Sequence, residues 1–401
     1  MESIIEAPVT IQQTINRNET KIHLNYLDGL RAVLAMYVLL YHFMREVDVK
    51  TNLVARLISY PFIYGPSAVV AFIVLSGFCL MLPVTRNNNY LKGTTGNFIR
   101  KRAKRILPTY YLAMLFAIVL IVSVIDNNSA TQWNGVAILN PKVLITHILL
   151  IHNIFGDTSR TINYCFWSIA VEWYIYFLFP PLVVFWRRLG AAKAMLISFA
   201  ATLALCIVLA HSRLNLDFQA ISPNFISCFA LGMLACHLSF SENKIRLFFI
   251  KHKSSILVLP ILAGLIVACE HFKYILRRYE SPIYTSGSLT TDFLMALFIC
   301  LLLIFLSINT APLLKKILSF KPLVFIGTFA YSIYLIHAPI IEIFMRYIIL
   351  PFHLRALPSI IGILLIGLPA ILTVSWLFYL VAEKPFLKNV IPKKHHLDVK
   401  H

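Results

Sequence analysis

The sequence contains few charged residues. Only 13% of its 401 residues are Asp, Glu, Lys or Arg, whereas 59% are hydrophobic, and its mean hydropathy is +0.77. Because roughly a quarter of the residues of a soluble domain are charged, this composition excludes an ordinary soluble domain. The apolar residues also cluster in runs of about twenty, which is the length that a helix needs to cross roughly 30 Å of hydrocarbon.

Several motifs of soluble enzymes and metal sites are absent as well. The sequence has no G-x-S-x-G, H-E-x-x-H, Walker A or G-x-G-x-x-G pattern. Its seven cysteines are odd in number, lie mostly in apolar runs and never have C-x-x-C spacing. We therefore predict buried cysteines rather than a disulfide framework, and no metal site. The first 26 residues contain no apolar core, so we expect no cleavable signal peptide.

Ten apolar runs are long enough to cross a bilayer. They cover residues 27–46, 62–84, 105–125, 167–186, 191–211, 221–240, 254–270, 290–309, 322–345 and 358–382. The predicted fold class is therefore all-α, a polytopic membrane bundle of about ten transmembrane helices. We expect one domain over residues 27–386, between an N-terminal tail (1–26) and a C-terminal tail (387–401).

The distribution of basic residues predicts the orientation of the bundle. A net charge of +19 is typical of some nucleic-acid-binding proteins, but in a membrane protein Lys and Arg anchor cytoplasmic loops, so we expect no nucleic-acid partner. With both termini in the cytoplasm and the flanking Arg105 and Lys193 included, the inner loops and the residues after the last run hold 22 Lys and Arg against 3 Asp and Glu. The outer loops hold 10 against 5. This bias predicts that the shorter run 141–155 does not cross. We expect it to lie on the membrane or to dip into it as part of an outer segment, in a bacterial inner membrane or a plasma membrane.

Ionisable side chains inside the apolar runs are the main functional candidates, because they are costly in the bilayer core. Arg31 and His42 are eleven residues apart, close to three helical turns, so both project from one face of the first helix. Glu172 is five residues into its run and His42 is four residues from the end of its own. We therefore predict that Glu172 orients His42 as a general base; the alternative is a purely structural pair. Glu46 is a weaker candidate, because a residue near the end of a run can reach the interface.

Two further patterns each have two interpretations. Arg102 and Arg105 share a helix face in the basic segment FIRKRAKRILP, which is either a topological anchor or a clamp for phosphate groups. Trp167, Ser168 and Tyr176 lie around Glu172 in an aromatic segment. Such aromatic residues either anchor a helix at the membrane surface or form a platform for sugar rings.

Taken together, these segments resemble acyltransferase family 3, whose multi-span enzymes modify envelope glycans. YLDGLRAVLAMYVLLYH resembles the opening motif, an Arg and a His separated by ten residues, and FIRKRAKRILP resembles the basic R-x-x-R motif. GPSAVVAFIVLSGF, WSIAVEW, GTFAYSIYLIHAPI and AEKPF are similar to later motifs, in the family's order. The resemblance covers most of the chain, from Tyr26 to Phe386, and is specific as a set.

The resemblance implies an O-acyltransferase that uses acyl-CoA, with acetyl-CoA as the default donor. It implies that His42 is essential, that Arg31 and Glu172 assist it, and that Arg102 and Arg105 contact coenzyme A. The implied acceptor is a hydroxyl group of a glycan or a lipid-linked saccharide at the outer surface of the bilayer.

Two other classes of protein remain as alternatives. A transporter could use Arg31, His42 and Glu172 as a proton or substrate relay, but the inverted repeats that would favour this class are not seen. The unrelated membrane-bound O-acyltransferase fold has its essential His in a late apolar run, a position that His337 imitates.

Overall fold

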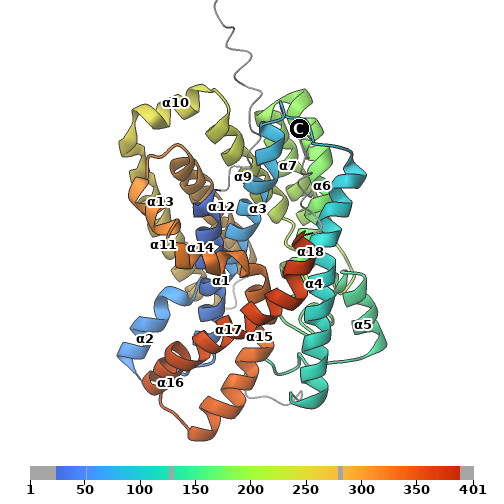
Figure 1. The fold of residues 1–401 in the computed structure, drawn as a ribbon, viewed down its shortest axis with the longest axis vertical. Helices are drawn as coiled ribbons and strands as arrows, with labels where there is room; N and C mark the ends of the chain where they lie inside the picture. Colours follow the sequence, from blue (N-terminus) through green and yellow to red (C-terminus); the bar gives the residue numbers. More distant parts are fainter. Residues whose placement is uncertain (1–23, 51, 126–130, 279–282, 389–401) are drawn as a thin grey trace, which may run out of the picture.

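The computed structural model describes residues 24–388 except residues 51, 126–130 and 279–282, so the two predicted tails lie almost entirely outside the described residues. In the first half of the chain, α1 and α3 lie in the middle of the bundle, with α4, α5 and α6 to one side of them (Figure 1). The helices of this half are α1 (Asn25–Arg45), α2 (Leu53–Ser59), α3 (Gly65–Thr85), α4 (Thr95–Ser123), α5 (Pro141–Ile148), α6 (Trp167–Leu189), α7 (Ala191–Ala210), α8 (Phe218–Ile221) and α9 (Phe225–Phe240). The second half continues with α10 (Lys244–Lys251), α11 (Val258–Arg278), α12 (Ile283–Ser307), α13 (Pro312–Leu318), α14 (Lys321–Thr328), α15 (Ala330–Phe344), α16 (Ala356–Gly362), α17 (Leu368–Phe378) and α18 (Lys384–Lys388).

The predicted fold class is confirmed, because ten helical segments of the described chain are long and apolar enough to cross a membrane. Two of the predicted runs differ clearly from the observed helices. Helix α4 begins at Thr95, ten residues before the apolar run, since the side chain of Thr94 caps it by accepting a hydrogen bond from the backbone of Asn97 at 3.2 Å. The predicted run 322–345 is divided at Phe329 into α14 and α15.

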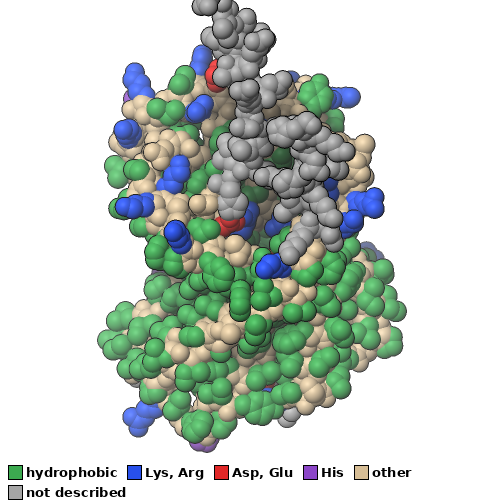
Figure 2. Space-filling view, viewed as in Figure 1, with side chains coloured by type: hydrophobic (Ala, Val, Ile, Leu, Met, Phe, Trp, Pro, Cys, Tyr) green, Lys and Arg blue, Asp and Glu red, His purple; other side chains and the backbone are tan. Residues whose placement is uncertain are grey.

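Lys and Arg side chains are sorted toward one end of the bundle. Figure 2 shows most of those on this face over the upper half of the molecule, above a broad hydrophobic region, with a few at the lower end. The same end carries α10 and α13, which both lie in loops predicted to face inward (Figure 1). This sorting is what the positive-inside rule requires of a membrane protein. Which end faces the cytoplasm stays a prediction.

The segment 141–155 does not span the membrane. It forms α5, whose 8 residues extend only about 12 Å, followed by a short 3-10 turn. The hydroxyl groups of Tyr110 and Tyr111 on α4 donate to the carbonyl oxygens of His147 and Ile148 at 3.2 and 2.7 Å. These bonds hold the segment against α4, so the irregular backbone is packed on protein, as it must be at membrane depth.

Glycines let helices of the bundle approach closely. A Cβ atom added at Gly77 of α3 would lie 2.1 Å from the carbonyl oxygen of Phe229, and one added at Gly232 of α9 would lie 1.9 Å from that of Val74. Gly29 of α1 touches the backbone of Leu318 in the same way. Close approach through small residues is a main source of helix association in membranes, where burial from water contributes little.

We expect Gly77→Ala to destabilise the bundle by about 1–3 kcal/mol or more, because the new methyl group meets backbone that cannot move aside. The measurement is thermal unfolding in detergent, with the fraction of folded protein at each temperature read from size-exclusion chromatography. Gly264→Ala is the matched control, since no atom lies within 4 Å of its added Cβ. Equal melting temperatures for the two variants would contradict the close packing of α3 on α9.

Candidate active site

A cavity of about 210 Å³ lies between the helices and collects most of the predicted site residues. Its walls come from α1, α3, α4, α6, α14 and α15, with Leu387 of α18 also contributing. Apolar side chains such as Val69, Phe72 and Ile169 form part of the wall. The predicted site residues that line it are Arg31, Arg102, Arg105, Ser168, Glu172 and Tyr176.

Three guanidinium groups line this cavity. Arg31 donates to the carboxylate of Asp28, and its second terminal nitrogen lies 3.0 Å from Sγ of Cys79. The guanidinium carbon of Arg102 lies over the ring of Phe98 at 5.5 Å, while its buried Nε has no hydrogen-bond partner among the described residues. Arg105 is exposed. Arg102 is thus a half-buried cation with an unused N–H donor, an arrangement that suits an anionic ligand.

Glu172 is part of the same cavity wall. Its carboxylate accepts hydrogen bonds from the hydroxyl group of Tyr176 and, at 3.4 Å, from that of Ser76. The ring of Tyr176 also lies 5.9 Å from the guanidinium carbon of Arg102. Glu172 therefore belongs to the group of residues that surrounds the arginines.

The predicted pairing of Glu172 with His42 is wrong. No hydrogen bond joins them in the described structure, and His42 is not among the residues that line the cavity. The residue at the level of His42 is Cys165, which precedes helix α6. Glu172 is seven residues further along, or about 10 Å at the rise of a helix, so the depth estimate was too coarse to identify the partner of the imidazole.

The partners of His42 are Gln132 and, through it, Glu46. The amide nitrogen of Gln132 donates to Oε1 of Glu46 at 2.6 Å and to the carbonyl oxygen of His42 at 3.0 Å. These two bonds turn its Oε1 toward Nδ1 of His42, at 3.4 Å. His42 thus carries its proton on Nδ1, and Nε2 is free to accept. Burial raises the pKa of Glu46, and the hydrogen bonds from Gln132 oppose that rise.

Gln132 was not a candidate in the sequence analysis, and Glu46 was discounted because it lies at the end of a span. Nothing in their spacing indicated the contact, since Gln132 is 86 residues from Glu46 along the chain. The only usable signal was that the 126–166 segment was expected to lie over the membrane, close to the outer end of α1.

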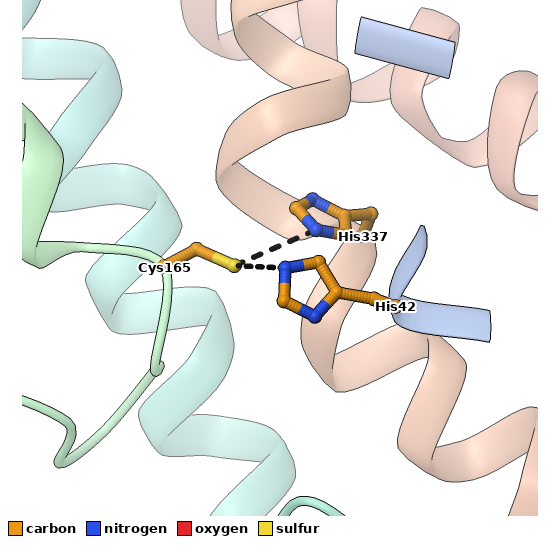
Figure 3. A group of neighbouring side chains, drawn as sticks. All are labelled: His42, Cys165 and His337. Atoms are coloured by element: carbon orange, nitrogen blue, oxygen red, sulfur yellow. Dashed lines mark hydrogen bonds between the residues drawn. The ribbon is translucent and has the colours of Figure 1, made fainter. Parts of the chain in front are cut away.

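His337 and Cys165 also lie beside His42. Sγ of Cys165 lies 3.7 Å from Nε2 of His42 and 3.5 Å from Nε2 of His337 (Figure 3). Nδ1 of His337 lies 3.0 and 2.9 Å from the carbonyl oxygens of Ile333 and Tyr334. A carbonyl only accepts, so His337 also carries its proton on Nδ1. These three side chains could hold a metal ion, a grouping that the sequence-based prediction of no metal site did not anticipate.

A hydrogen-bonded pair separates the cavity from this histidine cluster. The hydroxyl groups of Ser168 and Tyr334 lie 2.6 Å apart in the cavity wall, and each lies 3.3 Å from the carbonyl oxygen of Cys165. Because each hydroxyl group has one hydrogen, one of them donates to the other, which in turn donates to the carbonyl oxygen. The cavity therefore ends next to the cluster. Trp167 does not line the cavity; its ring packs against Phe225, with a centroid distance of 6.1 Å.

Known proteins similar to this chain are bacterial cell-wall enzymes. It is 28% identical over 337 residues to the putative peptidoglycan O-acetyltransferase YrhL of Bacillus subtilis and 27% identical over 334 residues to the peptidoglycan O-acetyltransferase OatA of Listeria monocytogenes. These matches cover 79% of this chain but only 48% and 49% of the two relatives. The O-acetyltransferase OatA of Staphylococcus aureus is 25% identical over 92% of this chain and 59% of its own length.

The chain thus spans about half to three-fifths of the length of these relatives. No solved structure matches it. The sequence model of a family described as "Acyltransferase domain" matches residues 24–380, which is most of the described helical bundle. This match shows that the chain belongs to acyltransferase family 3 and is a multi-pass membrane acyltransferase.

Proposed function

We propose that this acyltransferase moves an acetyl group from acetyl-CoA to a hydroxyl group of peptidoglycan or of its lipid-linked precursor. The observation that carries the proposal is the course of the cavity, from the arginines to the Ser168–Tyr334 pair beside His42. Guanidinium groups suit the phosphates of coenzyme A, and the apolar wall suits its uncharged arm. The named activity of the relatives suggests the acceptor.

In this proposal the basic end of the bundle faces the cytoplasm, where acyl-CoA is found, and both termini lie on that side. The donor phosphates bind Arg102 and Arg105, and the thioester reaches toward Ser168 and Tyr334. The acceptor hydroxyl group approaches His42 from the outer side, where the described residues of the outer segment, from Thr131 on, lie against the end of α1. Donor and acceptor thus meet from opposite faces of the membrane.

His42 acts as the general base. Its unprotonated Nε2 removes the proton from the acceptor hydroxyl group, whose oxygen attacks the thioester carbonyl. The carbon–sulfur bond then breaks, and the coenzyme A thiolate takes the proton back from the imidazolium. Gln132 and Glu46 hold the tautomer that this step requires. Glu172 and Arg31 shape the cavity through Tyr176 and Asp28 and orient the donor.

We expect Gln132→Leu to lower kcat about 3- to 10-fold, because it removes the hydrogen bond that fixes the His42 tautomer. The rate is measured as a function of pH, since a displaced tautomer changes the profile whereas a mild folding defect scales it uniformly. Gln219→Leu, at an exposed position of α8, is the control. A Gln132→Leu profile that matches the wild type would exclude Gln132 as a positioning residue.

The proposed reaction is tested with purified protein in lipid nanodiscs, supplied with acetyl-labelled acetyl-CoA and a soluble peptidoglycan oligomer. We expect labelled ester that mild base releases from the glycan, together with one equivalent of free coenzyme A. In parallel, cells that lack the protein should have peptidoglycan with fewer base-labile acetyl groups. Label that never appears on any glycan, with protein that binds acetyl-CoA, would refute the acceptor class.

A further inference from the structure

In the cluster of His42, Cys165 and His337, two imidazole nitrogen atoms face one thiol, which has a single hydrogen to donate. Both Nε2 atoms carry lone pairs, because each Nδ1 donates to an oxygen atom. Both lone pairs are directed at one thiol, as Figure 3 shows. A thiol has one hydrogen and can satisfy only one of them. Three atoms that can each donate an electron pair, one sulfur and two nitrogens, therefore face one another with one hydrogen between them.

The two sulfur–nitrogen distances are close to those of a tetrahedral zinc site. Bonds of about 2.3 Å to sulfur and about 2.0–2.1 Å to nitrogen place these ligand atoms about 3.5 Å apart at the tetrahedral angle. The observed sulfur–nitrogen distances are 3.7 and 3.5 Å, and the three ligand atoms all lie within 4.8 Å of one another.

The surroundings of the cluster also have the character of a metal site. Histidines that bind metals almost always donate their other ring nitrogen to a carbonyl or carboxyl group, as the Nδ1 atoms of His42 and His337 do here with Gln132, Ile333 and Tyr334. Zinc bound to one thiolate retains one positive charge. The carboxylate of Glu46, which holds the amide of Gln132, lies behind that amide and partly offsets this charge.

We propose that His42, Cys165 and His337 form a zinc-binding site whose occupation switches acyl transfer off. When zinc binds, the thiol of Cys165 releases its proton and the sulfur bonds to the ion, together with the Nε2 atoms of both histidines. A fourth position remains for water. The inhibitory consequence rests on the proposed function, because the ion takes the lone pair with which His42 would accept a proton.

Binding is tested first, without reference to activity. Purified protein is titrated with Co²⁺, which reports a thiolate ligand by a charge-transfer band in the near ultraviolet and a tetrahedral site by intense visible bands. We expect both features at one equivalent, and we expect Zn²⁺ to displace them. Cobalt held by histidines alone, for example in the terminal tail, gives no thiolate band.

Two cysteine variants assign the band. Cys165→Ser is expected to lose it, whereas Cys300→Ser, a buried cysteine of α12 outside the cluster, is expected to keep it. His337→Ala should weaken binding about tenfold or more, since one of three ligands is lost. A wild-type protein without the band, or a band that survives in Cys165→Ser, would overturn the site.

The switch is tested by acetyl transfer. We expect zinc to inhibit the wild type and a chelator to restore its activity. The zinc concentration that halves the rate of Cys165→Ser should be at least about tenfold higher than for the wild type, because one of three ligands is lost. Activity that depends on zinc would overturn the switch, and so would equal inhibition of the wild type and Cys165→Ser by zinc. If the cobalt bands appear but no variant acylates any glycan, the proposed function fails and the metal site stands.

Discussion

Purified His42→Ala protein is expected to transfer acetyl groups about 10²–10⁴ times more slowly than the wild type, the usual contribution of a positioned general base. His42 lies in the last turn of α1, where Gln132 sets its tautomer and the cavity ends nearby. The substitution leaves Gln132 in place, because its amide nitrogen donates to Glu46 and to the backbone carbonyl oxygen of residue 42, which alanine retains. The rate should therefore fall without a loss of folded protein.

The control for this variant is His237→Ala. His237 lies on α9, where its ring packs edge-on against Trp186 at 5.7 Å, far along the chain from the cluster. The His237→Ala substitution removes an imidazole from a different helix and should leave the rate of acetyl transfer unchanged. Both variants are compared by yield, melting temperature and acetyl-CoA binding. Undiminished transfer by His42→Ala would refute the assignment and direct attention to His337.

The architecture of this protein was predictable because the bilayer imposes one length scale. Any run of about twenty apolar residues has to be helical to satisfy its backbone, so counting runs gave the number of spans. Boundaries were less certain. Helix α4 extends ten residues beyond its apolar run because basic residues such as Arg100 are good helix formers, and a hydropathy pattern does not register them.

The residues around the cavity were predictable for a related reason. An ionisable group inside an apolar run has to be satisfied by another polar group or by a ligand, which identified Arg31 and Glu172. Arg102 and Arg105 were identified by the helix face that they share in the basic segment. The partners of His42 were not predictable. The depth of a residue along its helix limits the possible partners of His42 to about one helical turn at best. Cys165 and Gln132 also belong to an irregular segment, whose path no sequence periodicity predicts.

The separation of the two groups of residues has a mechanistic consequence. Glu172 accepts a hydrogen bond from Tyr176 in the cavity wall, whereas Glu46 holds the amide of Gln132 beside His42. In the proposed mechanism the first group contacts the donor and the second supports the histidine that receives the acceptor. Substitution of Glu172 should therefore change the use of the donor, and substitution of Glu46 should change the pH dependence of the rate. Burial raises the pKa of Glu46, so its carboxylate is lost as pH falls through a value above that of an ordinary glutamate.

Arg102→Ala is expected to raise the KM for acetyl-CoA about 10- to 100-fold with little change in kcat. A hydrogen bond to a charged group contributes about 1.5–3 kcal/mol, and binding lost equally from ground and transition states appears in KM alone. Arg102 is the strongest candidate of the basic segment, because its buried Nε lacks a partner among the described residues. Arg105→Ala should have a smaller effect in the same direction, since Arg105 is exposed.

The effect of Arg102 should depend on the phosphates of the donor. With S-acetyl-pantetheine, which carries no phosphate, wild type and Arg102→Ala should have the same KM. Arg100→Ala, at an exposed position outside the cavity, is the matched control and should behave as wild type with both donors. An Arg102→Ala protein with unchanged KM for acetyl-CoA would show that the basic segment only anchors the helix. A KM raised equally for both donors would show that Arg102 shapes the cavity rather than binding phosphate.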